Sequence, residues 1–368
     1  MNSSELEAYF KISPVVILRG SENLDLIKQN IWRQRTLIVT SKGALDRELT
    51  KTLITALSSE HTHIYSDINP NPDIDSLDNQ VNLLREHKFE HIIAIGGGSV
   101  IDSAKALAAT LPLETKNPLA EIFRGGSALP ESNFIEVSAI PTTSGTGSEV
   151  TPFATIWDKL RVKKHSLYDP LLFPKYALLI PELTFSLPRK ETLYTALDSL
   201  SHALESIWNN NSSLITQKIA EVSSRLIVEN LADTIENPTN RTGRSALQLS
   251  SLLSGIAIST TRTALAHSIS YPLTAKYGIP HGLACGFTLL ALLRKIQNEH
   301  GQILKDKALL ISLEEMLVSF NLNQEIKKYA KTSEILACLP QMTKSDRAGN
   351  FFLNFSSEDI SEIIKSSI

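Results

Sequence analysis

Cysteine is scarce in this sequence: 368 residues include only two, Cys285 and Cys338, and they form no CxxC pair. A disulfide framework and a cysteine-rich zinc site are therefore not expected. Long apolar runs are missing as well. The longest, 283–293, is interrupted by Gly286 and Thr288 and is too short to span a bilayer.

An excess of charge of one sign is also absent. The chain has 36 Lys and Arg against 39 Asp and Glu, for a net charge of -3, with both signs interleaved along its length. This balance argues against nucleic acid or an anionic membrane as the main partner. The first ten residues are polar and acidic, unlike a secretory signal, so we expect a cytoplasmic protein.

What is present is the composition of a globular protein, with 42% hydrophobic and 20% charged residues. The length suffices for two domains of ordinary size with a cleft between them. In the first half, short apolar runs alternate with amphipathic stretches, which predicts a parallel sheet covered on both faces. We expect strands at 15–18, 36–40, 92–95, 134–140 and 176–180, and a helix at 77–87.

From about Pro188 onward, apolar residues recur at helical spacing and strand patterns almost disappear. A last helix is expected after Ser356, because Ser356 and Asp359 form a capping pattern. The chain is therefore predicted to hold an α/β dinucleotide-binding domain at 1–186 and an all-helical domain at 187–368. The other helices expected in the second half are 193–208, 215–232, 246–258 and 283–297.

Two loops rich in glycine follow predicted strands. The first, 96–99, reads Gly-Gly-Gly-Ser and precedes a helix, so its N–H groups could bind a phosphate, or its glycines could serve the turn alone. The second, 141–149, combines glycine with small hydroxyl residues. Two such loops at strand ends of one sheet fit a dinucleotide crossing its carboxyl edge, although the G-x-G-x-x-G fingerprint is absent.

A candidate metal site lies in the helical half. Asp198 and His202 are four residues apart on one predicted helix face, as a chelating pair or an ordinary surface pair would be. His267 lies in an apolar stretch and His281 in a Pro-His-Gly turn, and either alone could be a hydrogen-bonded core residue. Together the four suit Fe²⁺ or Zn²⁺ in a catalytic site without a cysteine ligand.

These motifs, in this order and spacing, make the chain resemble the iron-containing (group III) alcohol dehydrogenases over nearly its full length. The resemblance implies a Rossmann-like parallel-sheet domain, an all-α domain in the dehydroquinate synthase-like arrangement, and a metal in the cleft. The matching segments are Gly96 to Lys105, Pro141 to Thr151, Pro181 to Thr184, Asp198 to Glu205, and His267 followed fourteen positions later by His281 within Pro280 to Gly282.

The resemblance also implies roles for single residues. It assigns the ion, Fe²⁺ or Zn²⁺, to Asp198, His202, His267 and His281. It places a second set of residues on or beside the cofactor, NADPH or NADH: Gly97, Gly98, Ser99, Asp102, Thr142, Thr143, Thr151 and Lys164.

The sequence departs from the family pattern at three places. Ser41, followed by Lys42, stands where members often have an Asp that binds the adenosine ribose, so we expect NADPH to be accepted at least as well as NADH. Tyr271 stands where many members have a second histidine four residues after the third ligand. The stretch 163–167, usually bland, reads Lys-Lys-His-Ser-Leu.

Within the family, segments 164–167 and 261–274 look most like the phosphonoacetaldehyde reductases. This resemblance implies reduction of phosphonoacetaldehyde to 2-hydroxyethylphosphonate, a step of phosphonate biosynthesis. The proton donor is Tyr271 or a water relay, although a tyrosine pKa near ~10 makes it a reluctant acid. We expect a homo-oligomer, a dimer. The residues expected to serve substrate and catalysis are Arg262, Thr263, Lys164, His165 and Tyr271.

Three other functions remain open on this reading. The first is a general alcohol dehydrogenase for short-chain alcohols and aldehydes. The second is a lyase like dehydroquinate synthase, which also uses a nicotinamide cofactor and a metal but consumes no net cofactor. The third is a scaffold protein without catalysis, against which the four intact ligands argue.

Overall fold

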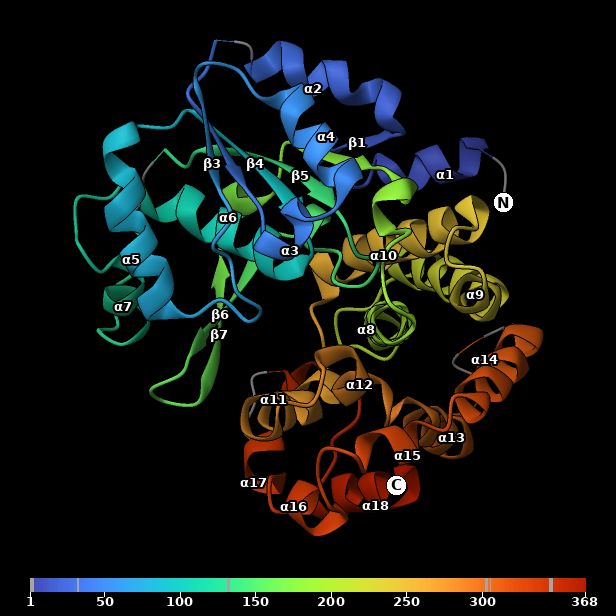
Figure 1. The fold of residues 1–368 in the computed structure, drawn as a ribbon. Helices are drawn as coiled ribbons and strands as arrows, with labels where there is room; N and C mark the ends of the chain where they lie inside the picture. Colours follow the sequence, from blue (N-terminus) through green and yellow to red (C-terminus); the bar gives the residue numbers. More distant parts are fainter. Residues whose placement is uncertain (1–2, 32, 131–132, 302–303, 305, 344–346) are drawn as a thin grey trace. The chain divides into compact units, whose positions relative to one another are not determined.

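The computed structural model describes residues 3–31, 33–130, 133–301, 304, 306–343 and 347–368. The chain divides into two compact units, coloured along the sequence in Figure 1. The N-terminal unit comprises Met1–Thr143 and Ser148–Ser186, and the C-terminal unit comprises Ser144–Gly147 and Leu187–Ile368. None of the helices in the described residues is both long and apolar enough to cross a membrane.

The N-terminal unit is built on a six-stranded parallel sheet with the strand order β1-β8-β5-β4-β2-β3. The predicted parallel α/β sheet is thereby confirmed. β3 was not expected, because its sequence, THIY, is partly polar and only partly buried. The strands are β1 (Val16–Arg19), β2 (Thr36–Val39), β3 (Thr62–Tyr65), β4 (His91–Gly96), β5 (Glu136–Pro141) and β8 (Tyr176–Leu179).

Helices cover both faces of this sheet because its central strands are apolar on both sides. In β4, Ile92 and Ala94 join one core cluster while Ile93 and Ile95 join the other. The first cluster includes residues of α5 and α6, and the second includes residues of α2 and α4. The helices of this unit are α1 (Ser3–Phe10), α2 (Leu24–Ile31), α3 (Lys42–Leu45), α4 (Glu48–Leu57), α5 (Ile74–Leu84), α6 (Gly98–Thr110) and α7 (Pro118–Phe123).

A separate antiparallel hairpin, β6 (Phe153–Asp158) and β7 (Lys163–Tyr168), follows the second glycine-containing loop (Figure 1). The sequence analysis predicted no strand here, and in β7 lysines and a histidine occupy a strand that is only partly buried. Strand pairing with the more apolar β6 overrides that weak pattern. The 163–167 stretch therefore lies outside the six-stranded sheet.

The described part of the C-terminal unit contains helices and no β-strand, as predicted. The expected single helix 283–297 was wrong, because two helices replace it and the break falls at Phe287–Thr288. The predicted cap at Ser356 is confirmed by a reciprocal pair of hydrogen bonds with Asp359. The main helices are α8 (Arg189–Ile207), α9 (Leu214–Glu236), α10 (Arg241–Thr261), α11 (Leu265–Tyr277), α12 (His281–Gly286), α13 (Leu289–His300) and α14 (Lys307–Ser319).

The remaining helices are short, except for the last. They are α15 (Leu322–Ile326), α16 (Thr332–Leu336), α17 (Leu339–Met342) and α18 (Ser357–Ser367). The centre of this unit is α8, whose residues from Ala196 to Ile207 are all buried. Among them are two acids and a histidine, and a buried charge must find a partner or a ligand.

Candidate metal centre and cofactor loops

Three histidine side chains of the C-terminal unit converge on one carboxylate oxygen, Asp198 Oδ1. The Nε2 atoms of His202, His267 and His281 lie 3.7, 3.4 and 3.9 Å from it. Asp198 and His202 come from one face of α8, His267 from α11 and His281 from the first residue of α12. The structure thus brings together all four residues that the sequence nominated as metal ligands.

The histidine rings are arranged around this oxygen at different depths. The rings of His202 and His267 stack with centroids 4.7 Å apart, and His281 meets His267 edge-on at 5.3 Å. The side chains of Asp198, His202 and His267 are 6%, 7% and 2% exposed, whereas His281 is 28% exposed. The accessible side of the group therefore lies at His281.

Glycine explains how α12 comes close enough to α8 to bring His281 beside Asp198. A Cβ at Gly282 would overlap the carbonyl oxygen of Tyr194. A Cβ at Gly286 would lie 2.9 Å from Leu197 Cβ. The glycine of the Pro-His-Gly segment therefore serves a close backbone approach between two helices.

Several atoms of this group have no hydrogen-bond partner. Asp198 Oδ1, His202 Nδ1 and His267 Nε2 are buried, and no described residue forms a hydrogen bond with any of these three atoms. Each unsatisfied buried polar group costs about 1–3 kcal/mol. A carboxylate and imidazoles also form a donor set that binds Fe²⁺ or Zn²⁺. The residues present therefore fit a divalent ion.

The electrostatics favour the protonation states that an ion requires at Asp198 and His202. Burial opposes charge on Asp198, but His202 and the other two histidines lower the pKa of its carboxyl below the ordinary value. Burial lowers the pKa of His202 to about 4. Near neutral pH this leaves a carboxylate beside a neutral imidazole, and both can donate electron pairs to a cation.

Glu205, to which the sequence analysis gave no role, is hydrogen-bonded to His267. Its Oε1 accepts the backbone N–H of His267 at 3.1 Å, and its Oε2 is hydrogen-bonded to His267 Nδ1. A carboxylate on Nδ1 fixes the ring so that Nε2 faces the ligand. The signal was present in the sequence, because Glu205 lies three residues after His202 on the same face of α8.

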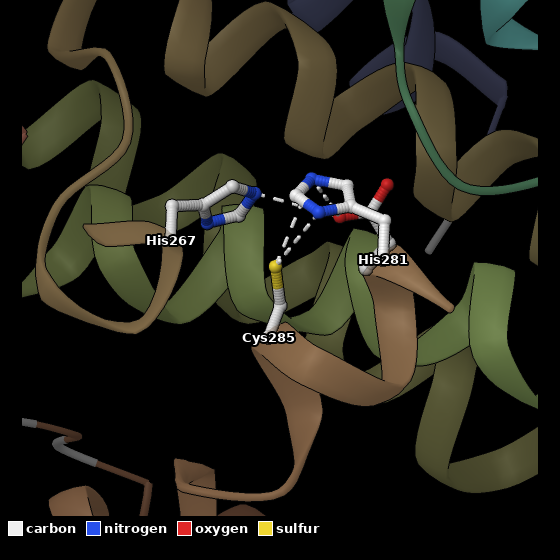
Figure 2. A group of neighbouring side chains, drawn as sticks. His267, His281 and Cys285 are labelled. Carbon is white, nitrogen blue, oxygen red and sulfur yellow. Dashed lines mark hydrogen bonds and ion pairs between the residues drawn. The ribbon is translucent and has the colours of Figure 1, made fainter. Parts of the chain in front are cut away.

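Cys285 is a second residue that the sequence did not single out. Its Sγ lies 3.8 Å from both ring nitrogens of His281, and Figure 2 shows it between His267 and His281. The small number of cysteines favoured a site without sulfur. Its position four residues after His281 would have placed it on the same face of a helix.

In the N-terminal unit, the first glycine loop joins β4 to α6. Gly97 is the N-cap residue of α6. Because glycine has no side chain, no side-chain hydrogen bond caps the N–H groups at the start of this helix. A Cβ at Gly97 would lie 3.2 Å from Thr143 Cγ2, so glycine allows Thr143 to approach. The Thr142 N–H donates to the Gly96 carbonyl at 3.0 Å. Four predicted cofactor residues, Gly97, Gly98, Thr142 and Thr143, therefore lie together.

A buried ammonium group fixes the segment that follows. Lys105 Nζ donates to the carbonyl oxygens of Ser148, Thr151 and Phe153 at 2.5, 2.7 and 2.9 Å. Burial lowers the pKa of Lys105 to about 8. Sequence reasoning listed Lys105 only as part of a motif, and the structure shows that it anchors Thr151.

Asp102 and Ser99, both expected on or beside the cofactor, already have partners within the protein. The Asp102 carboxylate accepts from Ser148 Oγ at 2.5 Å and from the Thr155 N–H at 2.8 Å. Ser99 Oγ accepts the Asn71 N–H at 3.2 Å. Asp102 therefore orders the loop around Thr151, whatever further contact it makes.

The second glycine loop is divided between the units. Residues Ser144–Gly147 belong to the C-terminal unit, where a Cβ at Gly145 would lie 2.7 Å from the Thr195 carbonyl oxygen. Gly147 has φ of 60°, and a Cβ there would lie 2.5 Å from Gly255 Cα. These two glycines serve close packing against α8 and α10, a purpose that the loop sequence did not reveal.

Ser41 caps the short helix α3, because its Oγ accepts the Ala44 N–H at 3.2 Å. Lys42 Nζ lies 2.7 Å from Asp67 Oδ1, and both side chains are exposed. Asp67 thus partly neutralises Lys42, the residue after Ser41 in the segment where we expect NADPH to be accepted. Sequence reasoning missed it because it follows β3, the strand that was not predicted.

The hairpin separates two residues that the sequence grouped together. Lys164 pairs with Trp157 across the hairpin and His165 with Ile156, so adjacent side chains point to opposite faces. Lys164 Nζ lies 5.9 Å from the centroid of the Trp157 ring. His165 stacks on Phe123 at 4.6 Å, and burial lowers its pKa. Lys164 and His165 therefore do not form one polar cluster.

Arg262, Thr263 and Tyr271 lie close to one another in the C-terminal unit. Arg262 ends α10 with φ of 62°, an uncommon conformation for a residue other than glycine. Thr263 Oγ1 lies 3.5 Å from the Tyr271 hydroxyl, and the Tyr271 ring stacks on His281 with centroids 6.1 Å apart. Thr263 thus contacts Tyr271, and Tyr271 contacts His281, the most exposed of the four proposed metal ligands.

Comparisons with known proteins agree with this architecture. The family model for the iron-containing alcohol dehydrogenase matches residues 14–181, and the model for the C-terminal part of the Fe-containing alcohol dehydrogenase family matches residues 192–368. The solved structure of sulfoacetaldehyde reductase from Bifidobacterium kashiwanohense in complex with NAD⁺ superposes with a TM-score of 0.85. It is 26% identical in sequence, and the match covers 96% of this chain and 97% of that one.

Two curated relatives show the range of named activities. The chain is 38% identical to the phosphonoacetaldehyde reductase of Streptomyces viridochromogenes over 214 residues, 57% of this chain and 54% of that protein. The match therefore spans about half the length of that relative. The chain is 30% identical to the long-chain primary alcohol dehydrogenase AdhA of Thermoanaerobacter ethanolicus over 308 residues, 81% of this chain and 74% of that protein. With both family models matched, the chain belongs to the iron-containing alcohol dehydrogenase family.

Proposed function

We propose that this chain is a metal-dependent, nicotinamide-linked aldehyde reductase whose preferred substrate is phosphonoacetaldehyde, which it reduces to 2-hydroxyethylphosphonate. The observation that carries the proposal is the group of buried, unsatisfied ligand atoms around Asp198 in the C-terminal unit. We further propose that residues 1–186 form the dinucleotide-binding domain and residues 187–368 the metal-binding domain.

The ligands assigned to the ion, Fe²⁺ or Zn²⁺, are Asp198, His202, His267 and His281. When bound, such an ion supplies Lewis-acid polarisation of the substrate carbonyl. The chain's own part is to keep the ligands in place: Glu205 orients His267, and Gly282 lets α12 carry His281 to Asp198. His281 is the most exposed of the four, which favours substrate approach from its side.

For the cofactor, the uncapped start of α6 supports phosphate binding by Gly97, Gly98 and Ser99. Thr143 lies against Gly97, and Lys105 holds Thr151 through its carbonyl oxygen. The nicotinamide supplies hydride. We propose that NADPH is used at least as well as NADH, because the position after β2 carries Ser41 in place of an acid that would repel a 2′-phosphate.

The proposed substrate carries a tetrahedral anion on a two-carbon aldehyde. Two of the named relatives are reductases of such aldehydes, one with a phosphonate and one with a sulfonate group. Arg262 supplies an exposed cation next to Thr263. Guanidinium groups bind phosphonate-like oxygens through paired hydrogen bonds.

The backbone around Arg262 is held in its uncommon conformation by two asparagine side chains. Asn209 Nδ2 donates to the Arg262 carbonyl at 3.3 Å, and Asn350 Nδ2 donates to the Thr263 carbonyl at 2.8 Å. Backbone strain that the surrounding structure maintains is typical of binding and catalytic segments. This supports a substrate-binding role for the segment.

Tyr271 is the proposed proton donor to the product alkoxide. Its hydroxyl lies 3.5 Å from Thr263 Oγ1 and its ring lies against His281. A hydroxyl partner can pass a proton onward from solvent, which offsets the weak acidity of a tyrosine with a pKa of about 10. A water relay through Thr263 would serve the same purpose.

The test is an aldehyde panel followed at the nicotinamide absorbance, with phosphonoacetaldehyde, sulfoacetaldehyde, acetaldehyde and butanal. We expect kcat/KM to be highest for phosphonoacetaldehyde. Arg262→Ala should lower that value about 10- to 100-fold, because a hydrogen bond to a charged group contributes about 1.5–3 kcal/mol. The neutral aldehydes should be little affected. Arg294→Ala, which removes an exposed arginine paired with Glu314, is the matched control.

Three outcomes would contradict the proposal. Equal efficiency with butanal and phosphonoacetaldehyde would indicate a general alcohol dehydrogenase. An equal loss for all substrates in Arg262→Ala would indicate that Arg262 supports the fold and not the phosphonate. No cofactor consumption with any aldehyde, together with turnover of a sugar phosphate, would indicate a lyase.

A further inference from the structure

Sulfur lies within the proposed metal centre. One donor atom from each of Asp198, His267, His281 and Cys285 forms a set in which all atoms lie within 4.8 Å of one another. Figure 2 shows Cys285 Sγ close to His281, with His267 on the other side. Among the described residues, this set includes Cys285, which the four-residue assignment leaves out, and does not include His202.

Cys285 is also held in this position. The residue is fully buried, and it lies between Gly282 and Gly286, the two glycines through which α12 packs on α8. Its Sγ lies 3.8 Å from both His281 nitrogens. Beside it, the buried Asp198 Oδ1 and His267 Nε2 have no hydrogen-bond partner in the described chain.

The other cysteine of the chain provides a contrast. Cys338 is equally buried, but its Sγ donates to the Glu334 carbonyl at 3.6 Å within its own helical segment. That is the environment of an ordinary structural cysteine. Cys285 instead faces ligand atoms that lack partners.

We propose that Cys285 binds the ion as a thiolate, so that the centre combines carboxylate, imidazole and sulfur ligands. This inference rests on the proposed metal site. Binding would release the thiol proton to solvent, because a coordinating thiol is deprotonated. A thiolate among imidazoles shifts the preference of the site from Fe²⁺ toward Zn²⁺.

X-ray absorption of the zinc-loaded protein at the zinc edge tests this directly. We expect a sulfur shell at about 2.3 Å in addition to nitrogen and oxygen at about 2.0–2.1 Å. Cys338→Ser should keep the sulfur shell, and the near-isosteric Cys285→Ser should lose it. With Co²⁺ in place of zinc, the near-ultraviolet sulfur-to-cobalt band should follow the same pattern.

The result for the unmodified chain decides the matter even if Cys285→Ser fails to fold. A zinc shell of nitrogen and oxygen alone overturns the cysteine proposal and leaves the metal site in place. A sulfur shell that disappears in Cys338→Ser, or persists in Cys285→Ser, also overturns it. A chain that binds no zinc, cobalt or iron overturns both this inference and the proposed function.

Discussion

Each unit of this chain buries a cluster of charged and polar side chains, and the two clusters differ in how their polar atoms are satisfied. In the N-terminal unit, Lys105 donates to three carbonyl oxygens, and Asp102 accepts from Ser148 and Thr155. We call this cluster closed, because its donors and acceptors form hydrogen bonds with one another.

The cluster in the C-terminal unit is open. Asp198 Oδ1 and His267 Nε2 lie 3.4 Å apart, and both are buried without a hydrogen-bond partner among the described residues. The Nε2 atoms of His202 and His281 lie 3.7 and 3.9 Å from the same carboxylate oxygen. Buried charge that is satisfied within the protein stabilises a loop, whereas buried ligand atoms left unsatisfied around one point indicate a binding site. The closed cluster therefore positions a loop, whereas the open cluster is a candidate catalytic centre, although both clusters contain motif residues of one family.

The largest expected effect comes from removing a ligand of the open cluster. His202→Ala and His281→Ala should lose the bound ion and lower kcat/KM about 1000-fold or more, because polarisation of the carbonyl by a metal contributes several kcal/mol. The measurements are metal content per chain and aldehyde turnover. His300→Ala, which removes an exposed histidine of the same unit, should change neither. Wild-type turnover by either ligand variant after chelation and dialysis would rule out the assignment.

The next effect concerns the closed cluster and is a loss of stability. Lys105→Met leaves buried carbonyl oxygens and Asp102 without their cation, so the free energy of unfolding should fall by about 3–5 kcal/mol in denaturant titration. Lys175→Met removes a half-exposed lysine paired with Glu136 and should cost about 0–1 kcal/mol. Metal content should stay at the wild-type value in folded Lys105→Met. Equal destabilisation by both substitutions would mean that the closed cluster is no stronger than a surface pair.

A smaller effect is expected from the residue that supports the open cluster. Glu205→Gln keeps the shape of the side chain but removes the charge beside His267 Nδ1, so metal affinity should fall about 10- to 100-fold. Competition with a chelator measures the dissociation constant. Glu314→Gln, in an exposed pair with Arg294, is the control. Unchanged affinity in Glu205→Gln would show that Glu205 does not tune the site.

The smallest effect concerns cofactor choice in the N-terminal unit. Ser41→Asp should shift the NADPH-to-NADH ratio of kcat/KM toward NADH at least about fivefold, because two charges ~4 Å apart in water interact by about 1 kcal/mol. Ser41→Asn, which is similar in size to Asp but neutral, should leave the ratio near that of wild type. A wild-type protein that strongly prefers NADH, with no change in Ser41→Asp, would refute this interpretation of the loop.

Much of the architecture could be predicted because it depends on strong local patterns. Buried strands such as Ile92–Ile95 are continuous apolar runs, and the long helices have regular apolar spacing. β3, β6 and β7 were not predicted. β3 and β7 are partly polar and only partly buried, so their strand conformation depends on pairing with a neighbour. The break at Phe287–Thr288 escaped prediction for a similar reason, since the sequence remains apolar across it.

The candidate site could be predicted as a set of residues but not as an arrangement. Asp198, His202, His267 and His281 belong to motifs with fixed spacing, and tertiary packing brings them together. The parts that escaped depend on contacts between distant segments: Glu205 with His267, Cys285 with His281, and Gly147 with Gly255. A single sequence does not distinguish a glycine that binds a phosphate from a glycine that allows helices to pack closely.

Anomalous diffraction at the absorption edge of the bound metal, from crystals of active protein, would test most directly that the open cluster is the ion site. We expect one strong peak per chain at about 2.0–2.2 Å from a carboxylate oxygen of Asp198 and from histidine nitrogens of the cluster. Active crystals with no peak there, or with the peak beside other residues, would contradict it.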